Sequence, residues 1–417
     1  MLLFHFLRFW LHYGMRIWFR KLYVHYEAPW PKDAPLLFAC THPNSAVDFI
    51  FLPLITGRKS FVMVRGDVFE NRWLNRMFRA IWMLPVYRMR DGFKTISKNK
   101  GSFIECFNEF DNNGRALIFS EGTSVQEKLL QPLMKGTARL AIDYIMSGEN
   151  KEIYVVPMAN NYTRFRQFRG TVITNFGKPI RVSDYVERDN ENQAKGYQKL
   201  TSEIHRALST ILIQQKNYRD DSLTEKALKV LRFNRLDERQ EWIIEDQSVF
   251  IEEQKVTEWM NEHDGKSLPK DFEERFNALE VDEHLEGVLK RSRKKAFHLA
   301  AKISTAFVMA VASIVHFLPY QLSRWIARNK IKDPLFENTI MTLGSTVFYV
   351  LQFFIVLTIL TSWIGWAGFV TSMSMLAVTA VYSEIVDDYR FAKFNVQKLK
   401  NWNAYKELYD DLMKSID

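Results

Sequence analysis

Cysteine is scarce in this chain of 417 residues: the sequence contains only Cys40 and Cys106, which lie far apart. Two such cysteines form neither a disulfide framework nor a cysteine-based metal cluster, so a reducing, cytosol-facing location is the simpler interpretation. The histidines have no partners at metal-ligand spacing either. We therefore predict no metal site and no cofactor.

Motifs of three other protein classes are also missing. Ser45 does not lie in a Gly-x-Ser-x-Gly elbow, which argues against a serine hydrolase. No glycine-rich loop ends in Lys-Ser or Lys-Thr, which argues against nucleotide hydrolysis. No zinc knuckle, helix-turn-helix signal or RNA-binding aromatic motif is found, so we predict no nucleic-acid partner.

Positive charge and aromatic residues, in contrast, are abundant. The net charge is +9, 14% of the residues are aromatic, and 11 are tryptophans. Lysine and arginine attract anionic lipid head groups, and tryptophan and tyrosine favour the membrane interface. The composition therefore predicts a lipid bilayer as a partner.

Residues 1–34 begin with an apolar, aromatic-rich stretch that arginines interrupt and follow. No positive region precedes this stretch and no small-residue cleavage site follows it, so a secretory signal peptide is not indicated. The pattern predicts an amphipathic helix over residues 1–22 that lies in the membrane interface. A core helix of the globular domain is the alternative.

Residues 35–215 alternate short β-rich runs with segments of helical spacing. This alternation predicts an α/β catalytic domain with a mixed sheet. The expected strands are Leu36–Cys40, Ser60–Val64, Arg115–Phe119, Ile153–Pro157 and Thr171–Phe176.

Residues 216–296 are dense in charged residues, with apolar positions at helical spacing. They predict a charged helical region inserted before the membrane-like sequence. The basic cluster at 290–295 closes this region, and we expect it to contact lipid head groups because an apolar segment follows directly.

Residues 297–417 are expected to associate with the membrane. No residue from Asn338 to Ser383 is charged, and this stretch is long enough for two spans of about 20 residues each. With a turn at Gly365 and Gly368, the pattern predicts a transmembrane hairpin at about 340–383.

A shorter apolar run covers residues 303–318, with basic residues on both of its sides. Because lysine and arginine gather on cytoplasmic loops, this run favours a segment that dips into the membrane and returns. The same reasoning places the catalytic domain on the cytoplasmic face of the membrane.

A histidine and an aspartate follow the first expected strand of the α/β region. They are His42 and Asp48, and the intervening Pro-Asn-Ser residues are typical of a turn. We expect this turn to bring the two side chains together at the exposed end of the sheet. An imidazole held by a carboxylate can take a proton from a hydroxyl near neutral pH, so the sequence predicts an enzyme.

Three further blocks follow this first one along the chain. The second is the run from Leu84 to Gly92, and the third is Ile118–Ser124 followed by Pro132–Arg139. The fourth is Val155–Met158, which leads to Asn175–Ile180.

The order, spacing and content of these four blocks resemble the glycerophospholipid acyltransferases, the family of lysophosphatidate and glycerol-3-phosphate acyltransferases. The resemblance covers about residues 35–185. It implies that His42 is the general base and that Asp48 orients it. Five residues separate the two, whereas four is the commonest spacing in the family.

The resemblance also implies a binding site for the acceptor. It places Arg88 and the block Glu121, Gly122 and Thr123 at the acceptor's phosphate and glycerol. A carboxylate repels phosphate, so we expect Glu121 to bond a glycerol hydroxyl or a basic side chain. Ser124 stands where many members have an arginine, which shifts phosphate binding toward Arg88 and other cations.

Two more residues are assigned to substrate binding. Lys135 is expected at the phosphate, with a solvated helix start as the alternative, and Arg139 is a further candidate cation. Pro157 belongs to the fourth block, which the family links to binding of the acyl donor.

The sequence thus predicts a membrane-bound O-acyltransferase of phospholipid biosynthesis. The expected acceptor is 1-acylglycerol-3-phosphate, and the expected co-substrate is an acyl thioester of coenzyme A or acyl carrier protein. The alternatives are a glycerol-3-phosphate acyltransferase, a phospholipid transacylase, and a non-catalytic membrane protein.

Overall fold

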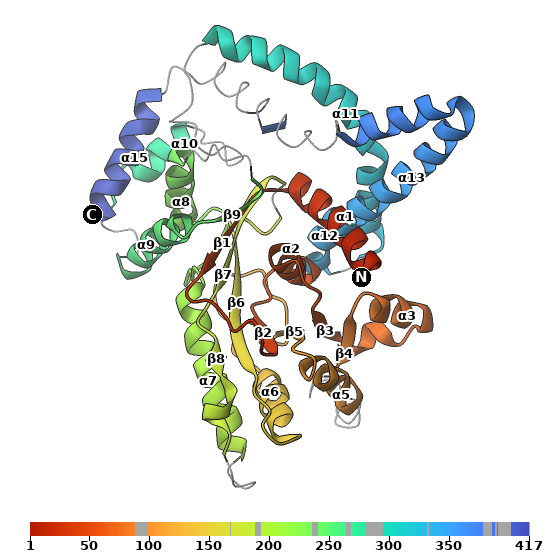
Figure 1. The fold of residues 1–417 in the computed structure, drawn as a ribbon. Coiled ribbons are helices and arrows are strands. Elements are labelled where there is room, and N and C mark those ends of the chain that lie inside the picture. Colours follow the sequence, from red (N-terminus) through yellow and green to blue (C-terminus); the bar gives the residue numbers. More distant parts are fainter. Residues whose placement is uncertain are drawn as a thin grey trace.

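A mixed β-sheet forms the centre of the computed structural model (Figure 1). The structure describes residues 1–87, 99–166, 168–187, 193–235, 241–263, 268–279, 295–331, 333–377, 386–387, 390 and 402–416. The nine strands are β1 (Phe19–Tyr26), β2 (Leu36–Cys40), β3 (Phe61–Arg65), β4 (Met83–Val86), β5 (Arg115–Phe119), β6 (Tyr154–Tyr162), β7 (Gly170–Phe176), β8 (Ile180–Arg181) and β9 (Ile243–Glu245).

The strand order is β4-β3-β5-β2-β6-β7-β1-β9, and β8 pairs with β6 beside this path. Neighbouring strands are parallel except where β7 and β8 meet β6. The predicted α/β class with a mixed sheet is therefore confirmed. Because β4, β3, β5, β2 and β6 run in one direction, their carboxyl ends meet at one edge of the sheet.

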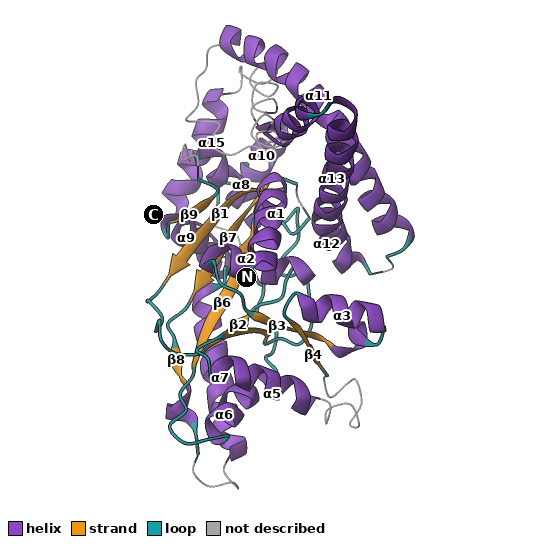
Figure 2. Cartoon of the chain, turned by 45° about the vertical axis from the view of Figure 1, so that its right-hand side comes forward, coloured by secondary structure: helices purple, strands orange, loops and turns teal. Residues whose placement is uncertain are grey.

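Helices cover both faces of this sheet (Figure 2). The longer ones are α1 (Leu2–Trp18), α2 (Phe51–Thr56), α3 (Arg72–Ala80), α5 (Asn99–Phe110), α6 (Gly136–Met146), α7 (Gln193–Ile211), α8 (Leu223–Asn234), α9 (Ser248–His263), α10 (Phe272–Leu279), α11 (Lys295–Asn329), α13 (Ser345–Ile364) and α15 (Trp402–Ile416). Shorter helical turns are η1 (Ser45–Ile50), η2 (Gly66–Phe69), η4 (Val182–Tyr185), η7 (Pro334–Phe336), α12 (Glu337–Thr339) and η8 (Ile340–Gly344).

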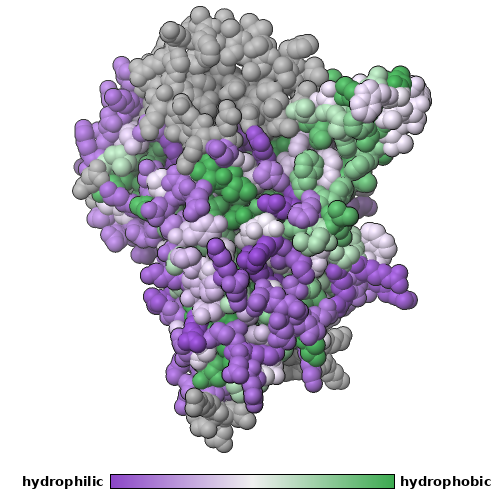
Figure 3. All heavy atoms as spheres, viewed as in Figure 1, coloured by the Kyte–Doolittle hydropathy of each residue, from purple (hydrophilic) through white to green (hydrophobic). Residues whose placement is uncertain are grey.

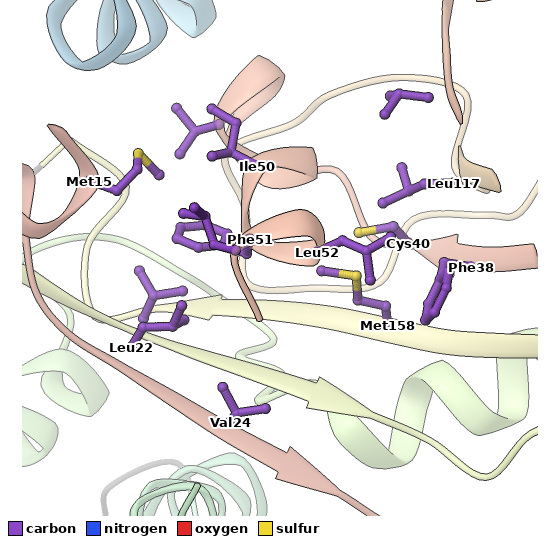
Figure 4. Packing of buried hydrophobic residues seen from close by; sticks show 14 of the residues in the cluster. Met15, Leu22, Val24, Phe38, Cys40, Ile50, Phe51, Leu52, Leu117 and Met158 are labelled. Carbon is purple, nitrogen blue, oxygen red and sulfur yellow. The ribbon is translucent and has the colours of Figure 1, made fainter. Parts of the chain in front are cut away.

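Strand β2 lies near the middle of the sheet, and all five of its residues are fully buried. Its side chains alternate between the two faces, as a strand requires. Phe38 and Cys40 join the apolar cluster that includes Phe51 of α2. Figure 4 shows part of this cluster in a close view. Leu37 and Ala39 join the cluster that α5, α6 and α7 cover. This double burial fixes the strand that leads into the predicted catalytic turn.

The sheet extends beyond the region predicted for it. The N-terminal helix ends at Trp18, four residues earlier than expected, and β1 follows directly and pairs with β7. The charged region likewise contributes β9, which pairs with β1. Residues 19–26 and 243–245 were therefore wrongly assigned by sequence, because the pairing partners that make them strands lie far away in the chain.

The other regular elements described in the charged region are helices, as predicted. Helices α8, α9 and α10 share an apolar cluster that also contains Leu408 and Leu412 of α15. The C-terminal helix thus packs on the charged region and does not belong with the apolar helices. Residues 290–294 of the basic cluster predicted at 290–295 lie outside the described residues.

Helix α11 is continuous from Lys295 to Asn329. The prediction that residues 303–318 dip into a membrane and return is therefore wrong, since the chain does not reverse its direction there. Basic residues on both sides of an apolar run suggested a return, but one long helix carries both flanks as well.

One helix of the described part, Glu337–Ile364, is long and apolar enough to cross a membrane. Gly365 follows with φ +57°, and a second apolar helix runs over Trp366–Ala377. Figure 1 shows the two as a hairpin at the upper right, and Figure 3 shows hydrophobic residues gathered there. Residues 378–383 of the predicted hairpin lie outside the described residues.

Candidate active site

The predicted contact between His42 and Asp48 is present at the carboxyl edge of the parallel strands. His42 follows β2 after one residue, and η1 carries Asp48 back toward it. The Nδ1 atom of His42 lies 3.1 Å from Oδ2 of Asp48. Because Nδ1 faces the carboxylate, the other ring nitrogen, Nε2, is the atom that can meet a substrate.

The carboxylate of Asp48 is completely buried and held from three sides. Its Oδ2 atom also accepts a hydrogen bond of 2.8 Å from the backbone N–H of Asn44. Its Oδ1 atom accepts one of 2.6 Å from the hydroxyl of Tyr162. A buried charge needs such partners, and together they fix the direction in which Asp48 faces His42.

Tyr162 was missed by the sequence analysis. It lies at the end of β6, beside β2 in the sheet, and burial together with the Asp48 charge raises the pKa of its hydroxyl well above the usual value. The hydroxyl therefore stays protonated and donates a hydrogen bond to Asp48. A tyrosine far along the chain gives no local sequence signal, so only the strand pairing could have revealed this contact.

The imidazole of His42 is partly open to solvent, with 18% of the side chain exposed. One of its faces stacks on the ring of Phe119, with ring centroids 3.7 Å apart and planes inclined by 17°. Phe119 ends β5, which pairs with β2, so two neighbouring strands set the position of the ring.

The sequence predicted that Glu121 bonds a glycerol hydroxyl or a basic side chain, and in the structure both of its carboxylate oxygens accept hydrogen bonds from backbone N–H groups. Its Oε2 atom accepts a hydrogen bond of 3.0 Å from the backbone N–H of His42, and Oε1 accepts one of 3.3 Å from Gln131. Burial raises the pKa of this carboxyl to about 7, and the two backbone hydrogen bonds oppose the shift. Glu121 thus holds the main chain of the histidine and of the following loop.

The residues after Glu121 hold the other end of the catalytic turn. Gly122 has φ +65°, a conformation that favours glycine. Thr123 is half-buried, and the hydroxyl of Ser124 accepts a hydrogen bond of 3.1 Å from the backbone N–H of Ser45. The third sequence block therefore acts on the first block directly.

The remaining predicted residues lie at different distances from His42. Arg88 is outside the described residues, although Tyr87 before it is held at both backbone polar groups by Asn99. Lys135 is exposed and directly precedes α6. Pro157 is buried inside β6, opposite Ala39, and so lies in the sheet below the open edge.

Two further cations of this region already have partners. Lys128 is buried, and its Nζ atom lies 2.6 Å from Oε1 of Glu225 in α8. Arg139 lies over the ring of Tyr197. Among the described residues, an exposed cation at the carboxyl edge of the sheet is Arg65, which ends β3 and pairs with Asp67.

Among the described residues, no group of three or more histidine, cysteine, aspartate or glutamate side chains could hold a metal ion.

Comparison with known proteins gives similarities of three kinds. The family model described as acyltransferase matches residues 21–161. Glycerol-3-phosphate O-acyltransferase 2 of Saccharomyces cerevisiae is 25% identical over 193 residues, which cover 45% of this chain and 25% of that protein. The chain thus spans about a quarter of the length of this curated relative.

The third similarity is to a solved structure. The 1-acyl-sn-glycerophosphate (LPA) acyltransferase PlsC of Thermotoga maritima is 15% identical, with a TM-score of 0.32. The match covers 48% of this chain and 78% of that one.

Proposed function

We propose that the chain transfers an acyl group from a thioester to a hydroxyl of a glycerol-phosphate lipid precursor, and the match of residues 21–161 to the acyltransferase family model supports this. The observation that carries this proposal is the position of His42. Its Nδ1 atom is bound to a buried, fully coordinated carboxylate, while part of the ring is open to solvent. A general base for a hydroxyl needs this combination.

In the proposed reaction, Nε2 of His42 takes the proton of the acceptor hydroxyl. The hydroxyl oxygen attacks the thioester carbonyl carbon, a new C–O bond forms, and the C–S bond breaks. The thiolate leaves and receives the proton from the imidazolium. Asp48 stabilises the imidazolium while it exists and keeps the proton of the neutral ring on Nδ1.

We propose 1-acylglycerol-3-phosphate as the acceptor. A phosphate needs cationic recognition, and arginine provides it through two parallel hydrogen bonds. Arg88 remains our candidate, because it directly follows Tyr87 at the end of β4. Arg65 joins it as a candidate, since β3 ends at the same edge of the sheet.

Glycerol-3-phosphate is the second candidate acceptor. The similarity to the yeast glycerol-3-phosphate O-acyltransferase supports it. The donor is an acyl thioester of coenzyme A or acyl carrier protein, and the proposed mechanism requires no other cofactor.

We further propose that the chain is attached to a membrane, with the catalytic domain on the cytoplasmic face. Helix α1 buries one face, including Trp10 and Tyr13, against Tyr349 and Phe353 of α13. The same side of the helix also exposes apolar side chains, namely Leu2, Leu3, Phe6 and Phe9. The apolar face of α1 and the long apolar helix thus lie side by side, which supports their contact with the same bilayer (Figure 2).

The test uses the purified full-length chain and acyl-CoA with a labelled acyl group, incubated separately with each acceptor. We expect labelled phosphatidic acid from 1-acylglycerol-3-phosphate, and a loss of about 10²–10⁴-fold in kcat for His42→Ala. An unchanged kcat in the variant would overturn the mechanism. Acylation of lysophosphatidylcholine alone would overturn the choice of acceptor.

Two controls separate the remaining alternatives. A labelled phospholipid offered without any thioester would give labelled product only if the chain is a transacylase. A folded chain that acylates none of the acceptors would show that it is not catalytic.

A further inference from the structure

The first turn of the long apolar helix contacts the turn that carries the catalytic residues. Asn338, in α12, donates a hydrogen bond of 3.0 Å from Nδ2 to Oδ1 of Asn44. Only 2% of Asn338 and none of Asn44 is exposed. Two residues that are 294 positions apart in the sequence thus meet in the interior, next to the catalytic pair.

Asn44 links this contact to the carboxylate. Its backbone N–H donates to Oδ2 of Asp48 at 2.8 Å, and its side-chain Nδ2 donates to the carbonyl of Phe165 at 3.1 Å. Its carbonyl accepts from the N–H of Val47 and so begins η1. Asn44 therefore holds both the carboxylate and the start of the helical turn that presents it.

The contact with Asn338 supplies a hydrogen-bond donor to a buried oxygen, Oδ1 of Asn44. In the part of the chain that the structure describes, Asn338 is the donor to Oδ1 of Asn44. A buried acceptor that loses its donor is unfavourable, because no water replaces the lost hydrogen bond. Without Asn338, the side chain of Asn44 would be drawn toward another donor, and its backbone N–H would move relative to Asp48.

We propose that Asn338 is a positioning residue of the catalytic turn, which acts through Asn44 and Asp48 on the imidazole of His42. The C-terminal apolar helix then completes the active site from outside the α/β domain. This inference rests on the proposed function, in which His42 is the general base.

Three substitutions test the proposal in the full-length chain. Asn338→Leu keeps a similar volume and removes the donor. Asn338→Asp keeps the shape and places an oxygen against Oδ1 of Asn44. The matched control is Thr342→Val, because Thr342 lies about one turn further along, is equally buried, and its hydroxyl makes no hydrogen bond with the described residues.

The first measurement is steady-state kinetics with the best acceptor. We expect both Asn338 variants to lower kcat by about 10–100-fold with KM changed less than about 3-fold, because a small misplacement of a catalytic group costs rate. Thr342→Val should keep both constants within about 2-fold of the original chain. A kcat unchanged in both Asn338 variants, or an equal loss in Thr342→Val, would overturn the proposal.

The second measurement does not depend on activity. Hydrogen–deuterium exchange of the segment 44–50 should become faster in Asn338→Leu, and stay unchanged in Thr342→Val, while exchange in β2 and β5 is the same in all three chains. Equal protection of 44–50 in every chain would overturn the contact. Faster exchange in Asn338→Leu, in a chain that acylates no acceptor, would overturn the proposed function and support the contact alone.

Discussion

Tyr162 donates its hydroxyl to Asp48 over 2.6 Å, from the strand next to the one that leads to His42. The carboxylate is thereby bonded on both oxygens before any substrate arrives. His42 then faces an acid whose orientation depends on the sheet itself.

We expect Tyr162→Phe to lower kcat about 10-fold, because Oδ1 of the buried Asp48 would lose its donor. The free energy of unfolding should fall by about 1–3 kcal/mol. The control is Tyr144→Phe, which removes a hydroxyl bonded to Asp111 away from His42 and should leave kcat unchanged. Kinetics and thermal unfolding of both variants check this, and equal kinetic losses would contradict it.

Glu121 should make the stability of the protein depend on pH. Burial raises the pKa of its carboxyl from 4.5 to about 7, so the folded chain holds a proton that the unfolded chain has lost. The contribution of this proton to the free energy of unfolding is fully present below pH 4.5 and is lost as the pH rises to about 7. The loss over that range amounts to about 3 kcal/mol. The free energy of unfolding of the original chain should therefore fall relative to Glu121→Gln between these values. Parallel curves for the two chains would contradict the prediction.

Gly122→Ala should destabilise the protein by about 1–2 kcal/mol, since φ is +65° at this position and an alanine there is strained. The added Cβ would also lie 3.1 Å from Cγ of Met134, which is exposed and can yield. Gly101→Ala, in α5, is the control. Its Cβ would meet no atom within 4 Å, so this change should be neutral or stabilising. Denaturant unfolding of both variants distinguishes the two cases.

Lys128→Met should destabilise the protein by about 3–5 kcal/mol, because it leaves the buried carboxylate of Glu225 without its closest cation. The exposed pair of Arg219 and Asp221 provides the comparison, and Arg219→Ala should leave the free energy of unfolding nearly unchanged because solvent screens this pair. Similar losses of stability in the two variants would show that the buried pair of Lys128 and Glu225 contributes no more than the exposed pair.

Part of this structure could be predicted because the relevant signals are local. The apolar runs of β2 and β5 gave the bounds of both strands, and the turn after β2 gave the contact between His42 and Asp48. Strand β9 has three residues, too few for a recognisable pattern. Strand β1 continues directly from a helix and takes its form from pairing with β7.

The groups around the carboxylate could not be predicted for a related reason. Tyr162 and Asn338 reach Asp48 and Asn44 through contacts that span more than a hundred residues of chain. The sequence identified Glu121 as a site residue, but it did not predict the hydrogen-bond partners of its carboxylate. Only the fold shows that two backbone amides lie within reach of this side chain.

The helical turn η1 fixes the number of residues that can separate His42 from Asp48. Successive residues of a 3₁₀ helix are rotated by about 120° around its axis. Deleting Ala46 would therefore swing the carboxylate about a third of a revolution away from the imidazole, toward the flank that now carries Val47. The five-residue spacer and the 3₁₀ helix that begins within it are geometrically matched, so neither can change alone.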